Sequence, residues 1–196
     1  MRYATNILAI CVAALLALGI VMLYSAGMSQ SGARFRSMQL YGAGLGMLVC
    51  FIATAIDYRW LKKIAFPLFG FSLVLLILVL IPGVGTFKNG AYRWLDLGPM
   101  YFQPSELAKI SLLIALAAWG QLHGRRMSEF KYGLAFPGIA IALTLGFIFY
   151  EPDYGTTMLL ATVCCILLFV AGSNWKYIVP PMAAGAVLMG VAIMNN

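Results

Sequence analysis

Two short polar segments hold the residues of this chain that are best suited to chemistry. The first contains Arg93, Glu106 and Lys109, and the second contains Glu151 and Asp153. Glu106 and Lys109 are three positions apart, so on a helix both side chains lie on one face. Arginine and lysine bind phosphate oxygens, whereas carboxylates orient a hydroxyl group or a cation. Together these residues predict a polar site for an anionic ligand that carries phosphate.

The Glu106–Lys109 pair also has a structural interpretation. Pro104 suits the first turn of a helix, with Gln103 just ahead of it, and Glu106 would then stabilise the helix dipole by ~0.3–1 kcal/mol. However, an ionisable residue in a membrane span costs at least ~2.5–3.5 kcal/mol at its worst position, and such residues usually face a cavity. We therefore favour a working cavity over a structural ion pair.

The second segment joins two apolar runs and contains two acids but no base. Asp153 is well placed to cap the following helix through a side-chain oxygen, and Glu151 would then mark the membrane interface. Taken alone, the segment supports the structural and the functional interpretation equally. The orientation predicted below places it on the same side as Arg93 and Glu106, which favours a single polar site.

The chain that positions these residues has the composition of a membrane protein. Of its 196 residues, 63% are hydrophobic and 10% are charged, against roughly 45–50% and 25% in globular proteins. A water-soluble domain is therefore excluded. The formal net charge is +7, but the charged residues lie between long uncharged runs. The basic excess cannot form a nucleic-acid patch, so we expect no nucleic-acid partner.

Seven apolar stretches are long enough to cross a bilayer as helices, which takes ~20 residues. We predict an all-α, polytopic membrane helix bundle that forms one transmembrane domain over residues 1–196. The predicted spans lie near residues 7–25, 38–56, 64–81, 105–122, 133–150, 155–172 and 177–194. The first span exceeds the 7–15-residue apolar core of a signal peptide, so we expect it to stay in the mature protein.

The basic residues predict the orientation, because cytoplasmic loops carry an excess of lysine and arginine. With the N-terminus inside, eight basic residues are cytoplasmic: Arg2, Arg59, Lys62, Lys63, Arg125, Arg126, Lys131 and Lys176. Five are external: Arg34, Arg36, Lys88, Arg93 and Lys109. We expect a cytoplasmic N-terminus, an external Asn196, and both polar segments on the outer side.

The longest connection, which starts at Pro82 and runs into the fourth span, is expected to be ordered and to lie against the outer membrane surface. Asn89–Gly90 and Gly98–Pro99 are turn signals, while Arg93–Trp94 and Tyr101–Phe102 supply amphipathic anchors.

The remaining reactive residue types do not indicate a site. His123 lies in a basic segment beside Arg125 and Arg126, and we expect it to be a solvated loop residue. The chain lacks the motifs of phosphate-binding loops, dinucleotide-binding folds, serine hydrolases and zinc proteases. The four cysteines lie in apolar runs without CxxC spacing, so we expect them to have packing roles and to form no metal site: Cys11, Cys50, Cys164 and Cys165.

Four segments resemble the SEDS family, the FtsW and RodA proteins of bacterial cell-wall synthesis. The sequences NGAYRWLDLG at residues 89–98 and FQPSELAK at residues 102–109 resemble the family signature. The sequence EPDYGT resembles the family's Gln-Pro-Asp-Leu-Gly-Thr element, with Glu151 in place of Gln and Tyr154 in place of Leu. The sequence VMLYSA at residues 21–26 resembles the end of the family's first helix.

The resemblance implies a peptidoglycan glycosyltransferase that polymerises lipid II, an undecaprenyl-pyrophosphate disaccharide-peptide. The acceptor hydroxyl attacks the anomeric carbon of the donor and expels the lipid pyrophosphate, so the reaction needs a base and nearby cations. We expect four residues to bind this substrate: Arg93, Glu106, Lys109 and Asp153. Five supporting motif residues are Trp94, Gln103, Pro104, Ser105 and Glu151. A divalent cation at the substrate pyrophosphate is compatible with this reaction.

Members of the family have about ten transmembrane helices, and the aspartate held to be catalytic lies in a large outer loop after the seventh. We therefore interpret the chain as an N-terminal piece and expect the catalytic residue beyond Asn196. The piece alone is expected to insert without polymerising lipid II. The residues from Leu80 to Gly85 favour the FtsW branch over the RodA branch.

The family implies three kinds of partner: lipid II, a class B penicillin-binding protein, and components of the divisome or elongasome. It also implies a multi-pass location in the bacterial cytoplasmic (inner) membrane. Two alternative functions stay open, a lipid II flippase and a non-catalytic divisome scaffold. A flippase needs a pathway between leaflets, whereas all four candidate residues lie on the predicted outer side, which favours the polymerase.

Overall fold

The computed structural model describes residues 2–26, 32–81, 83–88, 91–96, 101–151 and 153–194. These residues form seven α-helices and three short β-strands, so the predicted helical membrane bundle is confirmed with the addition of a small sheet. The chain divides into two compact units, Met1–Asp57 and Tyr58–Asn196. The single transmembrane domain stays a prediction, and Asn196 lies outside the described residues.

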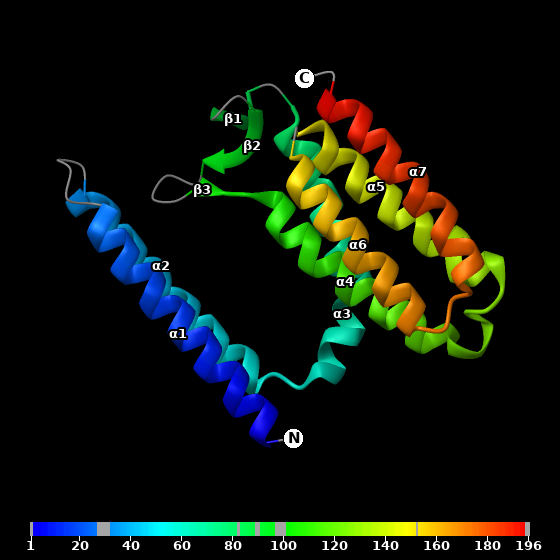
Figure 1. Cartoon of the computed structure of the whole chain (residues 1–196), viewed down its shortest axis with the longest axis horizontal. Helices are drawn as coiled ribbons and strands as arrows, with labels where there is room; N and C mark the ends of the chain where they lie inside the picture. Colours follow the sequence, from blue (N-terminus) through cyan, green and yellow to red (C-terminus); the bar gives the residue numbers. More distant parts are fainter. Residues whose placement is uncertain are drawn as a thin grey trace. The chain divides into compact units, whose positions relative to one another are not determined.

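The first unit contains helices α1 (Arg2–Ala26) and α2 (Gly32–Ala55), which pack against each other. Figure 1 shows both as long helices without a break. Large apolar side chains are exposed on both of them: Leu15 on α1 is 70% exposed and Phe51 on α2 is 75% exposed. Apolar surface of this extent is unfavourable in water and suits contact with lipid.

The described residues of the second unit form a five-helix bundle. Its helices are α3 (Tyr58–Val79), α4 (Pro104–His123), α5 (Phe136–Tyr150), α6 (Tyr154–Val170) and α7 (Trp175–Met194). Helices α3 and α4 pack directly, and between them the hydroxyl oxygens of Ser72 and Ser111 lie 2.6 Å apart in a buried hydrogen bond. The core is apolar and includes Leu76, Leu112, Met127, Ile148, Leu160, Leu168 and Ile178.

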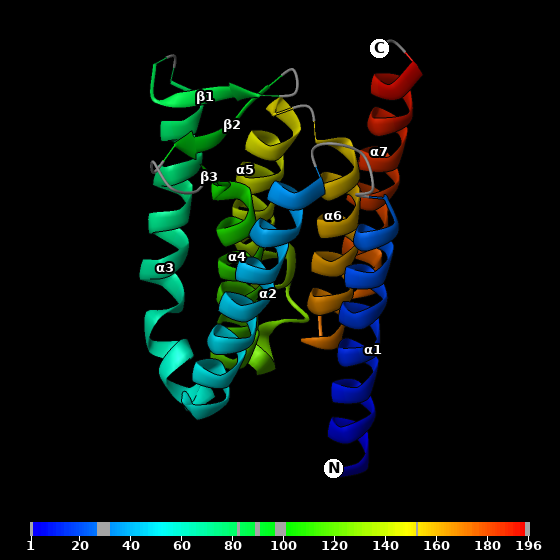
Figure 2. The same ribbon diagram turned by 90° about the vertical axis from the view of Figure 1, so that its left-hand side faces the viewer.

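A three-stranded antiparallel sheet lies in the connection between α3 and α4. Its strands are β1 (Gly85–Lys88), β2 (Ala91–Asp96) and β3 (Tyr101–Phe102), in the order β1-β2-β3. Figures 1 and 2 show the sheet at the end of the bundle where α5 ends and α6 begins. The connection was predicted to be ordered, but its strands were not predicted. The predicted turns at residues 89–90 and 98–99 lie outside the described residues.

The register of the sheet is set by close packing against α3. Leu95 pairs with Gly85 on one side and with Phe102 on the other. A Cβ atom at Gly85 would collide with the carbonyl oxygen of Val79 at the end of α3, so only glycine fits there. The first strand therefore begins close against the end of α3.

The opposite end of the bundle contains a 3₁₀ turn, η1 (Gly124–Arg126), and a π-helical turn, η2 (Lys131–Ala135), that leads into α5. The hydroxyl of Ser173 donates a hydrogen bond of 2.8 Å to the carbonyl oxygen of Gly133, which ties the α6–α7 turn to η2. The prediction that His123 is a solvated loop residue is wrong. It is the last residue of α4, and because Trp119 lies one turn earlier, the two rings stack with centroids 4.0 Å apart.

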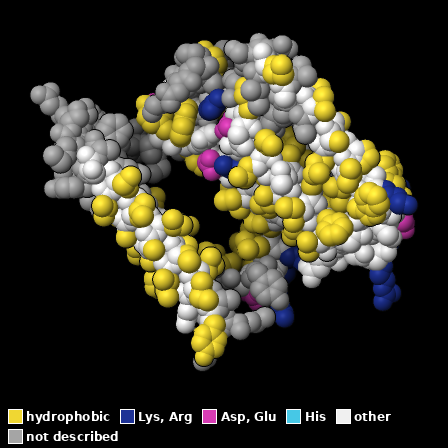
Figure 3. All heavy atoms as spheres, viewed as in Figure 1, with side chains coloured by type: hydrophobic (Ala, Val, Ile, Leu, Met, Phe, Trp, Pro, Cys, Tyr) yellow, Lys and Arg dark blue, Asp and Glu magenta, His cyan; other side chains and the backbone are white. Residues whose placement is uncertain are grey.

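All seven predicted spans coincide with helices, although α1, α2 and α3 each begin several residues before the predicted starts near residues 7, 38 and 64. Within the described residues, three helical segments are long and apolar enough to cross a membrane: Arg59–Val79, Pro104–Arg126 and Lys131–Tyr150. Shorter apolar helices are Asn6–Met22, Tyr41–Ala55 and Tyr154–Val170. Figure 3 shows hydrophobic side chains over much of the helix surface, with few charges among them.

Candidate functional site

Glu106 and Lys109 form an ion pair at the start of α4. The Nζ atom of Lys109 lies 2.8 Å from Oε1 of Glu106, and both residues lie on one face as their spacing predicts. The Lys109 side chain is 23% exposed, whereas the Glu106 side chain is 60% exposed. The ammonium group is therefore partly sheltered while the carboxylate is open, and an entering ligand can contact both.

The residues around the helix start are arranged as the sequence predicts. Pro104 occupies the first turn and Gln103 is the N-cap residue, but the Gln103 side chain makes no capping hydrogen bond. The hydroxyl of Ser105 is buried, and no described residue accepts or donates a hydrogen bond to it. Buried hydroxyls normally have a partner, so Ser105, which was predicted only to support the motif, is a candidate for ligand contact.

Arg93 ties the sheet to the turn between α5 and α6. Its Nε atom donates a hydrogen bond of 2.5 Å to the backbone carbonyl oxygen of Glu151. Arg93 and the neighbouring Trp94 are both half-buried on β2. The hydrogen bond brings a cation from the first polar segment directly to the second, a link that sequence spacing does not reveal.

The carboxyl group of Glu151 is buried in this turn. The residue is 1% exposed, and neither carboxyl oxygen has a hydrogen-bond partner in the part of the chain that the structure describes. Burial raises the pKa of Glu151 from 4.5 to about 7; the charge of Arg93 lowers the pKa and that of Asp153 raises it, but burial is the largest effect. The interpretation of Glu151 as an interface residue did not anticipate a buried group that changes charge near neutral pH.

Asp153 caps α6, as its structural interpretation predicts. Its Oδ1 atom accepts a hydrogen bond of 3.2 Å from the backbone N–H of Thr156. The hydroxyl of Thr157 donates a hydrogen bond of 2.7 Å to the backbone carbonyl oxygen of Asp153. These bonds fix the carboxylate at the start of the helix, next to the buried carboxyl of Glu151.

The structure thus arranges the predicted site residues in two groups at the sheet end of the bundle. One group is the Glu106–Lys109 pair on α4, and the other is Arg93 with Glu151 and Asp153 at the α5–α6 turn. Among the residues that the structure describes, no three His, Cys, Asp or Glu side chains lie close enough to hold a metal ion. A shared cavity for both groups, and a divalent cation in it, stay predictions.

Comparison with known proteins gives a consistent result. Residues 5–195 match the family of cell cycle proteins FtsW, RodA and SpoVE. The chain is 35% identical over 189 residues to the probable peptidoglycan glycosyltransferase FtsW of Trichlorobacter lovleyi, a match that covers 93% of this chain and 49% of the relative. The probable peptidoglycan glycosyltransferase FtsW of Allochromatium vinosum is 34% identical over 195 residues, with 96% and 49% covered. The chain therefore spans about half the length of the curated relatives it matches.

Solved structures agree with this assignment. The crystal structure of the rod shape determining protein RodA of Thermus thermophilus has a TM-score of 0.79 and 37% identity, covering 92% of this chain and 57% of that chain. A second structure, described as the structural coordination of polymerization and crosslinking by a peptidoglycan synthase complex, has a TM-score of 0.78 and 35% identity, with 96% and 54% covered. With its apolar helices, the chain is a multi-pass integral membrane protein, and it belongs to the FtsW/RodA/SpoVE family of cell cycle proteins.

Proposed function

We propose that the protein acts as a peptidoglycan glycosyltransferase that polymerises lipid II during cell division or cell-shape maintenance. Relatives that this chain matches over half their length are named probable peptidoglycan glycosyltransferases. In this proposal the 196 residues bind the substrate pyrophosphate and orient the lipid, and none of their own acids is assigned the role of catalytic base. The chain alone inserts into the membrane and does not polymerise lipid II.

The cluster of charged residues of both signs at the sheet end of the bundle carries the proposal. Lys109 is a partly sheltered cation beside an open carboxylate, and Arg93 is held at the α5–α6 turn by its bond to Glu151. Hydrogen bonds to charged groups contribute ~1.5–3 kcal/mol, more than neutral ones. Lys109 and Arg93 therefore contact the pyrophosphate oxygens, while Glu106 and Asp153 orient the sugar hydroxyls or a bridging cation.

The proposed location is the bacterial cytoplasmic membrane, with the N-terminus inside and the sheet end of the bundle outside. The excess of basic residues at the other end of the bundle supports this orientation. The proposed partner is a class B penicillin-binding protein of the divisome or elongasome. A similar structure belongs to a synthase complex that coordinates polymerization and crosslinking, which supports a partner of this kind.

Binding of lipid II to the purified chain in nanodiscs tests the site. Lys109→Gln should weaken lipid II binding roughly 10- to 100-fold, because it removes a charged donor worth ~1.5–3 kcal/mol. Lys63→Gln is the matched control, since Lys63 is exposed near the start of α3, at the end of the bundle remote from the sheet. Equal lipid II affinities for the two variants would remove Lys109 from the site.

Reconstitution in liposomes separates the proposed function from that of a flippase. With lipid II and a class B penicillin-binding protein present, the 196-residue chain should form no glycan strands and move no lipid II between leaflets. Transfer of lipid II across the bilayer would favour a flippase. Formation of glycan strands would assign the role of base to Glu106 or Asp153.

A further inference from the structure

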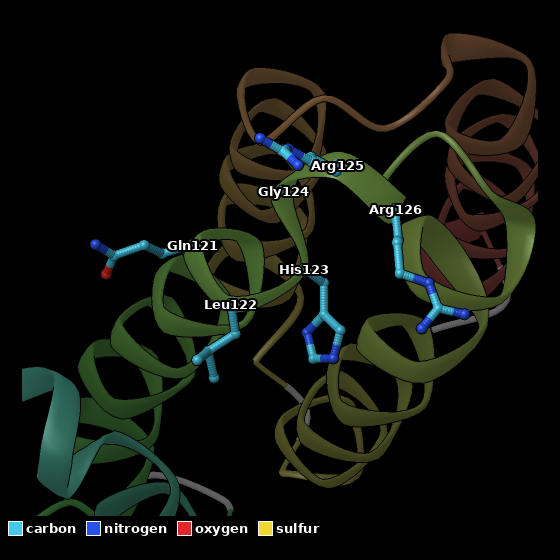
Figure 4. Close-up of a pocket in the computed structure, with 6 residues that line it drawn as sticks. All are labelled: Gln121, Leu122, His123, Gly124, Arg125 and Arg126. Carbon is cyan, nitrogen blue, oxygen red and sulfur yellow. The ribbon is translucent and has the colours of Figure 1, made fainter.

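The end of the bundle remote from the sheet contains a hollow next to the end of α4. Its volume is about 380 Å³, and six consecutive residues line it: Gln121, Leu122, His123, Gly124, Arg125 and Arg126. Figure 4 shows their side chains projecting from the last turn of α4 and from η1 in different directions around the bend. The volume lies within the range of ~300–1,000 Å³ that is usual for small-molecule sites.

The position of the hollow along α4 places it at a membrane interface. Glu106 and His123 lie near opposite ends of this helix, roughly 26 Å apart at ~1.5 Å per residue. The hydrocarbon core of a bilayer is ~30 Å thick. The hollow therefore lies at the opposite interface from the Glu106–Lys109 pair, at the depth of lipid headgroups.

The charge around the hollow is mainly positive. Arg125, Arg126 and Lys131 are exposed. Glu129 lies 3.4 Å from Arg126, but both side chains are more than half exposed, so this pair contributes only ~0–1 kcal/mol. Arg125 has no acidic side chain within ion-pair distance in the described part of the chain. The surface can therefore accept a further negative charge.

Aromatic rings form a wall beside these cations. Trp119 stacks on His123, and its indole N–H donates a hydrogen bond of 3.0 Å to the carbonyl oxygen of Tyr132. The guanidinium of Arg126 lies 4.0 Å from the centroid of the Tyr132 ring. Such a cation–π contact orders the arginine before any ligand arrives, which lowers the entropy lost on binding. Tryptophan and tyrosine are also the residues that mark the headgroup level of membrane proteins.

Apolar side chains on the elements around the hollow are also exposed. Leu122, which lines the hollow, is 55% exposed, and Phe136 at the start of α5 is 44% exposed. Compensation of the helix dipole explains why Arg125 and Arg126 follow α4, but it does not explain an adjacent hollow with an aromatic wall and an apolar edge. A ligand with both a negative headgroup and an acyl chain matches all of these features.

We propose that this hollow binds the phosphate headgroup of an anionic phospholipid. Arg126, which is held against the Tyr132 ring, pairs with the phosphodiester oxygens, and Arg125 adds positive charge on the other side of the bend (Figure 4). The acyl chains contact exposed apolar side chains such as Leu122. Basic pockets at the ends of transmembrane helices bind anionic headgroups in this way. The inference does not rest on the function proposed for the sheet end, because no residue is shared between the two sites.

Native mass spectrometry of the detergent-solubilised chain tests the proposal. The probes are phosphatidylglycerol and phosphatidylcholine with identical acyl chains, and inorganic phosphate as a competitor. The wild-type chain should bind phosphatidylglycerol at least tenfold more tightly than phosphatidylcholine. Each basic residue near an anionic surface contributes about fivefold, so Arg125→Gln with Arg126→Gln should weaken phosphatidylglycerol binding roughly 25-fold. Phosphatidylcholine, whose choline cation offsets its phosphate charge, should lose much less affinity.

Two further double variants control for net charge and for folding. Lys62→Gln with Lys63→Gln removes the same charge near the start of α3, at the same end of the bundle, and should keep the preference for phosphatidylglycerol. Arg125→Lys with Arg126→Lys should retain most of it. No preference in the wild-type chain, or equal losses in both glutamine variants, would overturn the proposal. Displacement of phosphatidylglycerol by equimolar inorganic phosphate would identify a general anion site and would also overturn it.

Discussion

The Nε atom of Arg93 donates a hydrogen bond of 2.5 Å to the backbone carbonyl oxygen of Glu151, and this bond joins β2 to the turn between α5 and α6. It holds a cation beside a buried carboxyl group and close to the carboxylate that caps α6. The small sheet is therefore more than a connection between α3 and α4. It fixes the relative position of the two polar segments.

Replacement of Arg93 by lysine should destabilise the fold. Lysine keeps the positive charge but lacks the planar guanidinium that reaches the Glu151 carbonyl oxygen, and the loss of a charged hydrogen bond costs ~1.5–3 kcal/mol. The melting temperature in detergent measures this effect. Arg125→Lys is the matched control, because Arg125 is exposed. Identical melting temperatures for the two variants would show that the Arg93–Glu151 bond contributes nothing to stability.

Glu151→Gln should remove a pH dependence of stability. Because the pKa of Glu151 is about 7 in the folded chain and ordinarily 4.5, the folded state binds this proton more tightly than the unfolded state. The stabilisation is complete below about pH 4.5 and is lost as the pH rises through 7. One pKa unit corresponds to ~1.4 kcal/mol, so the loss is about 3 kcal/mol.

Melting temperatures of the wild-type chain and Glu151→Gln, recorded in detergent from pH 4 to about pH 8, measure this difference. The glutamine variant should gain stability relative to the wild-type chain across the pH window from 4.5 to 7. Two parallel curves across that window would contradict the raised pKa of the buried carboxyl group.

Gly133→Ala should destabilise the turn that leads into α5. A Cβ atom there would collide with the carbonyl oxygen of Met127 and would lie 3.0 Å from the Ser173 hydroxyl oxygen. Overpacking of this kind costs ~1–3 kcal/mol. Gly138→Ala is the control on the same segment, because its Cβ atom would meet only Leu134, at 3.9 Å.

The control variant should be neutral or more stable by up to ~1 kcal/mol, since alanine is the better helix former. Equal melting temperatures for Gly133→Ala and Gly138→Ala would mean that the Met127 loop moves away from the added methyl group at little cost.

The helices were predictable because each apolar run must satisfy its own backbone hydrogen bonds in lipid. Local chemistry also predicted two helix starts: Pro104 in the first turn of α4, and Asp153 as the cap of α6. These features depend on residues within a few positions of one another. They follow from the sequence without any knowledge of the tertiary structure.

The burial of Glu151 and its link to Arg93 were not predictable in the same way. Both depend on the sheet packing over the α5–α6 turn, far along the chain from β2. The strands themselves are short and lie between turn residues. The sequence therefore has no long run of alternating apolar and polar residues that would predict them. The prediction for His123 was wrong for a related reason: its basic neighbours suggested a loop, whereas it is the last residue of α4 and stacks on Trp119.

Two substitutions of Asp153 should separate its capping role from its proposed role in the site. Asp153→Ala removes the oxygen that accepts from the Thr156 N–H, and should lower the free energy of unfolding by ~0.5–2 kcal/mol.

Asp153→Asn keeps a capping oxygen and should leave the melting temperature nearly unchanged, because asparagine and aspartate cap helices about equally well. The asparagine variant nevertheless loses the negative charge that we propose orients a substrate hydroxyl or a cation. We therefore expect it to bind lipid II more weakly while remaining as stable as the wild-type chain, as measured in the same nanodisc assay. Wild-type affinity in Asp153→Asn would reduce Asp153 to a helix cap and would leave the Glu106–Lys109 pair and Arg93 as the site.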